Sequence, residues 1–355
     1  MRAQQSSSSI MVDDKEIFAI NITGYVGGGI CQILSAAESA SLDQSARNLY
    51  LNLGSVEGMD GSGLQLLTIF ILQLRNHGFS LSVTSAPNWL REVFRLTCLD
   101  SLLTYRTDDA VSGAVPSSDN ARQWSAPVKR IEWPGLPADA NAVNAHRRVP
   151  LAPFSGFGPL LQRTYRVTLP GINLSPLQVM DIWREKFTTF WPQGNDLFAS
   201  APGITPGAPA VIHLSLPGGI KLFTGALVMH SSSDSFSLMT LQGHMFCGWI
   251  TFSSFIENGV LYIQTQALLR PSDALFDLSF RLGFGTRAED SFWHTSLLNL
   301  ASNFGVEGKV QQTNRLIDNH IQWKHFGNLR YNAGIRSVIY LVTHPFRSRR
   351  LAHKG

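Results

Sequence analysis

The stretch Gly58-Met59-Asp60-Gly61-Ser62-Gly63-Leu64 joins two apolar segments of different character. Before it, leucines alternate with other residues from Leu49 to Leu53, which is the pattern of a strand with one buried side. After it, residues 64–74 are almost continuously apolar and long enough for a helix. The stretch is therefore a tight loop between a strand and a helix. Its glycines permit a close approach of the backbone, and Asp60 or Ser62 can cap the free N–H groups of the first helical turn.

Further strands and helices surround this loop in a regular order. The periodicity predicts strands over 15–23 and 79–83, and helices over 30–45 and 87–96. Residues 1–12, which precede this unit, are mainly polar and rich in serine, so we expect a disordered tail there.

Three segments carry a family resemblance when they are taken together and in order: LYLNLGSVEGMDGSGLQLL, NHGFSLSVTS and LREVFRLTCLDSLL. They resemble the STAS family, the anti-sigma-factor antagonist domains of bacterial partner-switching systems. The resemblance covers residues 13–108. It implies an α/β domain with a mixed sheet flanked by helices, and a protein partner that is an anti-sigma factor or a switch-kinase-like protein.

The family signature is an Asp, a phosphorylatable Ser, a second Ser or Thr, and a Gly. Here these positions hold Asp60, Gly61, Ser62 and Gly63. Glycine has no hydroxyl group, so the usual phosphorylation switch cannot operate at position 61. The resemblance therefore implies a STAS module that stays unphosphorylated and competent to bind, or one that is regulated by other means. Ser62 either caps the helix or takes over as phosphoacceptor, since a helix N-terminus favours a phosphate.

The helix that follows the loop lacks a clear polar face. Leu66 and Phe70 lie off its main apolar stripe, where a surface helix would carry polar residues. Either the second half of the chain covers this face, or the face binds a partner. The predicted partner-binding residues are Asp60, Gly61, Ser62, Gly63, Leu66 and Phe70.

A second domain is predicted over 154–307, after a Pro-, Ala- and Ser-rich linker over 109–153. It begins with a strand, and Ser175-Pro176 then opens a helix. Five strand-like segments follow between residues 210 and 269, and a long helix is expected over 288–304. This order resembles the START/Bet v 1-like (helix-grip, SRPBCC) superfamily. The resemblance implies an α+β fold with a curved antiparallel sheet, a long C-terminal helix, and a cavity for lipids, sterols or polyketide-like ligands.

The pocket candidates are large or polar side chains that could point into such a cavity, although residues of this kind also fill ordinary cores. They are Trp183, Phe223, Met239, His244, Trp249, Tyr262, Trp293 and His294. No Ser/His/Asp set, paired carboxylates or HExxH motif is present, and GFGTRAED has the wrong glycine spacing for a phosphate-binding loop. The cysteines lie far apart, without metal-like spacing. We therefore expect no enzymatic activity, no cofactor and no metal.

Residues 308–355 form a basic C-terminal extension. Their single acidic residue is Asp318. Their basic residues are Lys309, Arg315, Lys324, Arg330, Arg336, Arg347, Arg349, Arg350 and Lys354. The extension is either a solvated tail or a peripheral contact with an anionic membrane, and we do not expect a nucleic-acid partner. Apolar residues at helical spacing from Tyr331 to Val342 predict that part of it packs on the body of the protein.

The composition fits this organisation. The chain has 355 residues with 44% hydrophobic and 15% charged residues, which suits two folded domains. It has no apolar run of the roughly 18–20 residues that a membrane-spanning helix needs, and its start has no signal-peptide pattern, so we expect a cytoplasmic protein. The first functional hypothesis is a bacterial regulatory protein, in which the STAS module docks on its partner and the second domain senses a hydrophobic ligand. The alternatives are a lipid-handling adaptor recruited to a membrane transport complex, or a cyclase-like enzyme that uses the cavity.

Overall fold

The computed structural model describes residues 4–12, 15–42, 47–105, 118–132, 144–199, 203–216 and 220–352. The chain forms two compact units: Met1–Pro127 with His230–Ser232, and Val128–Met229 with Ser233–Gly355. The division at Pro127 falls inside the segment 109–153, which we expected to link two domains.

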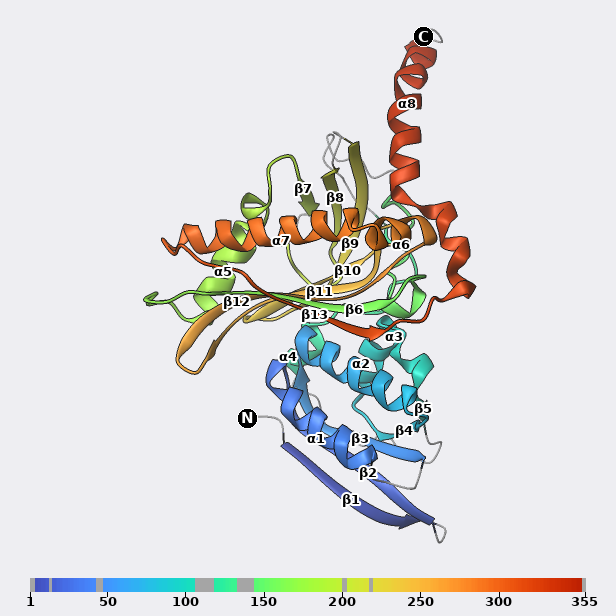
Figure 1. Ribbon diagram of the computed structural model, residues 1–355, viewed down its shortest axis with the longest axis vertical. Helices are drawn as coiled ribbons and strands as arrows, with labels where there is room; N and C mark the ends of the chain where they lie inside the picture. Colours follow the sequence, from blue (N-terminus) through green and yellow to red (C-terminus); the bar gives the residue numbers. More distant parts are fainter. Residues whose placement is uncertain are drawn as a thin grey trace. The chain divides into compact units, whose positions relative to one another are not determined.

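The first unit is built on a five-stranded sheet with the strand order β1-β2-β3-β4-β5 (Figure 1). Strand β1 is antiparallel to β2, and the remaining neighbours run parallel. The sheet is therefore mixed, as the α/β prediction requires. The strands are β1 (Gln4–Val12), β2 (Lys15–Val26), β3 (Asn48–Met59), β4 (Ser80–Ser85) and β5 (Thr104–Tyr105). The helices are α1 (Cys31–Leu42), α2 (Gly61–Asn76), α3 (Asn88–Leu96) and the short α4 (Ser118–Arg122), with the 3-10 turns η1 (Gly28–Ile30) and η2 (Leu99–Leu102).

The alternating leucines of β3 make the centre of this unit. Leu49, Leu51 and Leu53 are at most 1% exposed, which confirms the period-2 reading of this segment. One expectation differs: residues 4–12 form strand β1 and not a disordered tail. A run of serines can pair as an edge strand because the ladder uses backbone groups and not side chains.

The second unit holds an eight-stranded sheet with the order β13-β6-β12-β11-β10-β9-β8-β7. The pairs β13–β6, β6–β12, β12–β11 and β11–β10 are antiparallel, and so are β9–β8 and β8–β7. The strands are β6 (Leu160–Thr168), β7 (Asp196–Ala199), β8 (Pro209–Leu216), β9 (Ile220–Ser231), β10 (Ser235–Thr240), β11 (Phe246–Glu257), β12 (Val260–Pro271) and β13 (Gln311–Asp318). Strands β7 and β13 were not predicted.

Two helices contribute apolar side chains to the core that packs on this sheet. Helix α5 (Pro176–Glu185) starts with the predicted cap, a complete capping box between Ser175 and Gln178. Helix α7 (Phe284–Asn303) runs along the sheet in Figure 1 and buries Leu297 and Leu300 completely. An antiparallel sheet gripped by a long helix is the predicted helix-grip-like architecture. The shorter α6 (Ala274–Arg281) precedes α7 and was not predicted.

The C-terminal extension is only partly what the sequence indicated. Its first part is β13, which pairs with β6 at the edge of the sheet, so it belongs to the domain itself. The 3-10 segment η5 (Trp323–Tyr331) and helix α8 (Ala333–Ala352) follow. The apolar stripe of α8 does not pack on the body as predicted: Ile339 is 56% exposed and Val342 is 61% exposed.

Candidate functional site

The loop between β3 and α2 is a helix cap built around Asp60. Its Oδ1 accepts the backbone N–H of Gly63 at 2.7 Å, and its backbone oxygen accepts the N–H of Leu64 at 3.0 Å. The backbone N–H of Asp60 itself donates to Val26 of β2 at 3.2 Å. Asp60 is only partly buried, so its carboxylate is fixed at the start of α2 while part of it stays accessible.

The positions after Asp60 are closely packed. A Cβ atom at Gly63 would lie 2.0 Å from the backbone oxygen of Val26, so this position requires glycine. Gly61 is buried, and Ser62 is 3% exposed. A phosphoryl group on Ser62 would need space that this arrangement does not offer.

The two predicted contact residues on α2 differ in exposure. Leu66 is half-buried, whereas Phe70 is 2% exposed. A residue must be accessible to meet a partner, so Leu66 and Asp60 are the predicted positions on this loop and helix that remain partly open.

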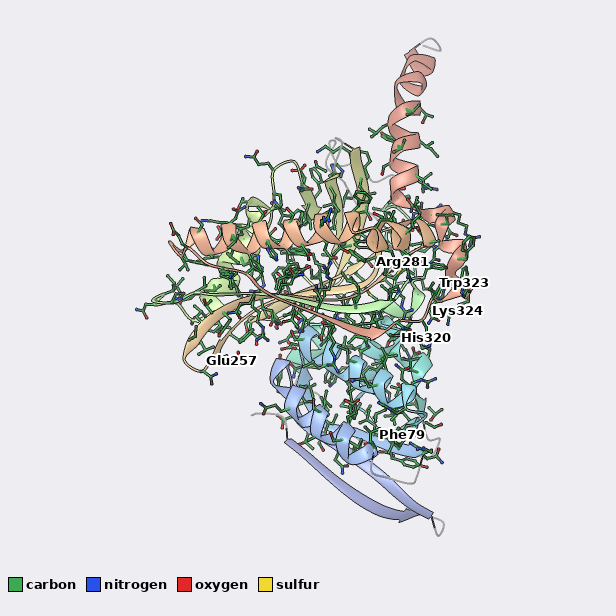
Figure 2. All side chains as sticks on the ribbon, viewed as in Figure 1. Phe79, Glu257, Arg281, His320, Trp323 and Lys324 are labelled. Carbon is green, nitrogen blue, oxygen red and sulfur yellow. The ribbon has the colours of Figure 1, made fainter. Side chains whose placement is uncertain are left out.

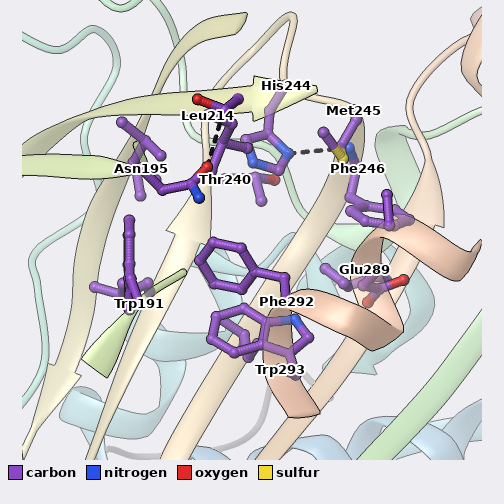
Figure 3. A pocket seen from close by; sticks show the side chains of 17 residues that line it. Trp191, Asn195, Leu214, Thr240, His244, Met245, Phe246, Glu289, Phe292 and Trp293 are labelled. Atoms are coloured by element: carbon purple, nitrogen blue, oxygen red, sulfur yellow. Dashed lines mark hydrogen bonds between the residues drawn. The ribbon is translucent and has the colours of Figure 1, made fainter. Parts of the chain in front are cut away.

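The second unit contains an apolar cavity of about 140 Å³ between the sheet and α7 (Figure 3). Its wall is formed mainly by apolar side chains from the sheet, from α7 and from the segment after α5. The lining residues are Trp191, Asn195, Ile212, Leu214, Ser215, Ala226, Leu238, Thr240, His244, Met245, Phe246, Ile250, Leu269, Ala288, Glu289, Phe292 and Trp293. The volume is below the roughly 300 Å³ of typical ligand pockets, but it is close to that of engineered cavities that bind benzene.

His244 contributes a fixed hydrogen-bond donor to the cavity wall. Its Nδ1 accepts the backbone N–H of Phe246 at 3.0 Å, so the neutral ring carries its proton on Nε2. Burial lowers the pKa of His244 to about 4, and the hydrogen bond from Phe246 offsets this only in part. The ring is therefore neutral at pH 7 in a single tautomer.

Glu289 is the second polar group of the wall and is 7% exposed. Its Oε2 accepts a hydrogen bond from Arg163 Nη1, while its Oε1 has no hydrogen-bond partner within the part of the chain that the structure describes. Burial raises the pKa of Glu289 to about 7, against the opposing attraction of the Arg163 guanidinium. Near neutral pH this carboxyl group can therefore carry a proton and act as a donor as well as an acceptor.

A polar network behind Glu289 fixes its position. The Oδ1 of Asp290 accepts hydrogen bonds from Arg163 Nη2, from the Tyr165 hydroxyl and from Gln312 Nε2, each at 2.8 Å. Arg163 thus divides its charge between two carboxylates. This sharing weakens its hold on Glu289, and the raised pKa of Glu289 is consistent with it.

Of the predicted pocket residues, His244 and Trp293 line this cavity. Strand parity explains four of the others. Leu238, Ala226, Ile250 and Leu269 line the cavity, whereas Met239, Phe223, Trp249 and Tyr262 lie on their strands at the opposite parity and so point to the other face of the sheet.

The two remaining candidates occupy other places. Trp183 is a residue of α5 and packs in the core, edge-on to Phe236 and Phe252. His294 Nε2 bonds Gln312 Oε1 at 2.9 Å toward β13. None of these six residues lines this cavity. For the four on strands, alternation along the sequence does not tell which face of the sheet is the hollow one.

Glu289 and Trp191 are cavity residues that no sequence pattern indicated. The indole Nε1 of Trp191 also has no hydrogen-bond partner among the described residues, and the side chain lines the cavity. The sequence holds no signal for the burial of Glu289, because it stands in a polar run between Thr286 and Ser291 at the start of the long helix.

Comparison with known proteins bears on the first unit. A family model described as the STAS domain matches residues 16–114. The N-terminal part of this chain is a STAS domain. The module is of a kind that mediates binding or regulation. No curated protein matches the chain.

Solved structures are similar to parts of the chain at a distance. An uncharacterised protein with a SpoIIAA-like fold from Shewanella loihica is 9% identical, with a TM-score of 0.25, and the match covers 30% of this chain and 89% of that one. The di-domain ARO/CYC StfQ of the steffimycin biosynthetic pathway is 11% identical, with a TM-score of 0.32 over 41% of this chain and 50% of that one. Ara h 8.0201 is 9% identical, with a TM-score of 0.30 over 41% and 97%. Similarities with TM-scores this low do not indicate a function.

Proposed function

We propose that this chain is a non-enzymatic regulatory protein, whose STAS domain docks on a protein partner and whose helix-grip domain holds a small hydrophobic ligand. The observation that supports a ligand is the apolar cavity, whose wall includes an oxygen of Glu289 without a hydrogen-bond partner among the described residues. A buried polar atom without a partner costs stability. A ligand that satisfies it would recover that free energy.

The size of the cavity limits the ligand. At about 140 Å³ it holds a molecule near the size of benzene and not a sterol or a phospholipid. The polar groups of the wall, His244 and Glu289, offer donors to an oxygen atom at neutral pH. The ligand we infer is a small aromatic or aliphatic molecule with a hydroxyl or carbonyl group.

The volume of the cavity also distinguishes the three functional hypotheses. A lipid-handling adaptor or a cyclase-like enzyme would have to enclose a chain or a polycyclic substrate, for which a cavity of about 140 Å³ is too small. The regulatory hypothesis needs only a small effector. It is the reading that the cavity favours.

The partner of the STAS domain in this proposal is an anti-sigma factor or a switch-kinase-like protein in a bacterial cytoplasm, and the outcome is control of transcription. The loop at Asp60 stays competent to bind because Gly61 cannot be phosphorylated. The 3% exposure of Ser62 supports the same conclusion for the next hydroxyl. Incubation with the partner and ATP should leave Ser62 unmodified, and a phosphate found on Ser62 contradicts a permanently competent module.

The ligand is tested with phenol as a probe, because it is near the size of benzene and carries a hydroxyl group. Binding is followed by quenching of tryptophan fluorescence in the full chain, because Trp191 and Trp293 line the cavity. Ala226→Phe should fill the cavity and abolish saturable quenching. Ala121→Phe, at an exposed position, is the control and should leave quenching intact. Equal quenching in both variants refutes ligand binding in this cavity.

The partner is tested by recovering proteins from a bacterial lysate on the full chain and on Asp60→Ala. Recovery of a sigma-factor regulator by the unmodified chain, lost in Asp60→Ala, supports the proposal. Recovery of membrane transporter subunits alone would replace it with the adaptor hypothesis.

A further inference from the structure

Helix α8 presents its apolar stripe to solvent and not to the core. Ile335, Val338, Ile339 and Val342 follow the i, i+3, i+4, i+7 spacing of one helix face, and they are 41%, 44%, 56% and 61% exposed. The opposite face holds Ser337, which is fully buried. A surface helix of a soluble protein normally has the reverse arrangement.

Polar contacts hold α8 in this inverted orientation. Ser337 Oγ accepts the backbone N–H of Phe223 at 3.0 Å and the Nδ2 of Asn144 at 3.1 Å. Arg336 Nε donates to the Oδ1 of Asn144 at 2.9 Å. These contacts fix the orientation of the first turns of α8. The apolar stripe therefore faces solvent because of specific hydrogen bonds and not because the helix frays.

The neighbouring elements expose apolar residues as well. Leu275, Leu278 and Leu282, at or just after α6, are 46%, 51% and 60% exposed. In η5, which packs on α6, Trp323 is 68% exposed and Phe326 is 50% exposed. Figure 2 shows Trp323, Lys324 and Arg281 near one another at one edge of this unit.

Buried and partly buried hydrogen bonds tie these elements together. Asp273, the cap of α6, accepts the Nδ2 of Asn332 at 2.9 Å, just before α8 begins. Asn328 of η5 donates at 2.8 Å to the backbone oxygens of Ser155 and Ser272. We call the exposed apolar residues of α6, η5 and residues 335–342 of α8 the outer apolar surface.

Positive charge accompanies this surface. Lys324 and Arg330 are exposed in η5, and the sequence of residues 347–350 adds three arginines. The only acidic residue from 308 onward is Asp318, which is paired with Arg270 at 2.5 Å. Two such surfaces would repel one another electrostatically, whereas an anionic lipid headgroup layer is complementary to them.

We infer that the outer apolar surface docks on an anionic lipid membrane. Exposed tryptophan and aliphatic side chains enter the headgroup region, and the lysine and arginine side chains meet the lipid phosphates. No described helix is long and apolar enough to cross a membrane, so the contact is peripheral. This function goes beyond the proposed binding of a partner and a small ligand, and it does not depend on the cavity.

The test is cosedimentation of the full chain with vesicles of phosphatidylcholine alone or mixed with phosphatidylserine. We expect binding to the mixed vesicles only. The binding should be lost in about 1 M salt, where the screening length falls to about 3 Å. The double variant Ile339→Glu/Val342→Glu should lower the partition at least ~10-fold, because it places anions on the apolar stripe.

Ile256→Glu is the matched control. Ile256 is 58% exposed but lies at the end of β11, away from the outer apolar surface. Its variant should bind vesicles as the unmodified chain does. Vesicle binding that is equal for all three proteins, or absent with mixed vesicles, overturns the inference. So does light scattering that shows a dimer disrupted by Ile339→Glu/Val342→Glu, because a second copy would then cover this surface. Quenching of the tryptophan fluorescence of the double variant by phenol should be unchanged, which separates this result from failure of the ligand proposal.

Discussion

The two ionisable groups of the cavity wall should act on stability in opposite directions as the pH changes. His244 has a pKa of about 4 in the folded chain against 6.5 as an ordinary value. Glu289 has a pKa of about 7 against 4.5. Replacing either group should therefore reveal the pH dependence of the other.

The sign follows from proton binding in the two states. Between pH 4 and 6.5 the unfolded His244 binds more protons than the folded one, so its contribution makes the protein more stable as the pH rises. Between pH 4.5 and 7 the folded Glu289 binds more protons than the unfolded one, so its contribution is lost as the pH rises. Each difference is about 2.5 pH units, or about 3 kcal/mol at 1.36 kcal/mol per unit.

The two contributions nearly cancel over the range that they share. Relative to the unmodified chain, the free energy of unfolding of Glu289→Gln should rise by about 3 kcal/mol from pH 4.5 to 7, because the falling contribution of Glu289 is removed. On the same comparison, His244→Asn, whose amide oxygen can still accept the Phe246 N–H, should fall by about 3 kcal/mol from pH 4 to 6.5, because the rising contribution of His244 is removed.

The assay is urea unfolding at a series of pH values, followed by tryptophan fluorescence. The STAS domain contains neither residue, so any separate transition of that domain serves as an internal reference. A Glu289→Gln profile parallel to that of the unmodified chain would refute the reasoning. It would mean that Arg163 keeps Glu289 ionised throughout and that attraction, not burial, decides its pKa.

Three further predictions concern stability. Gly63→Ala should destabilise the STAS domain by about 3 kcal/mol or more through overpacking against the backbone of Val26. Gly29→Ala, with open space around it, should change the unfolding midpoint little. Equal effects of the two variants would contradict the close approach of Gly63 to Val26. Arg163→Met should cost about 3–5 kcal/mol by leaving Glu289 buried without its cation, and thermal melting should show recovery when Glu289→Met is added; no recovery would assign the loss to packing. Ser175→Ala should cost about 1 kcal/mol by removing the cap of α5, measured by chemical denaturation against Ser175→Thr, which should retain most of the stability.

Local pattern was enough for most elements because their periodicity reflects burial directly. The alternation at Leu49–Leu53 and the Ser175 cap both lie where the sequence predicts them. The polar strands β1 and β13 were missed because edge strands bury little and carry no apolar alternation. The loop at Asp60 was recognisable because its helix cap is local, from Asp60 to the N–H of Gly63, whereas the close contact of Gly63 with Val26 of β2 came only with the tertiary structure.

The sequence by itself determined which residues share a face: the leucines of β3, the stripe of α8 and the alternating sides of β10 and β11. Only the tertiary structure decided which of those faces is hollow, filled or exposed. Met239 and Leu238 are equally apolar, yet only Leu238 lines the cavity, and the stripe of α8 points outward because Ser337 and Asn144 bind its other side. A repeat along the chain records the relation of a residue to its neighbours in sequence, whereas the direction of a face depends on contacts with residues far away in the chain.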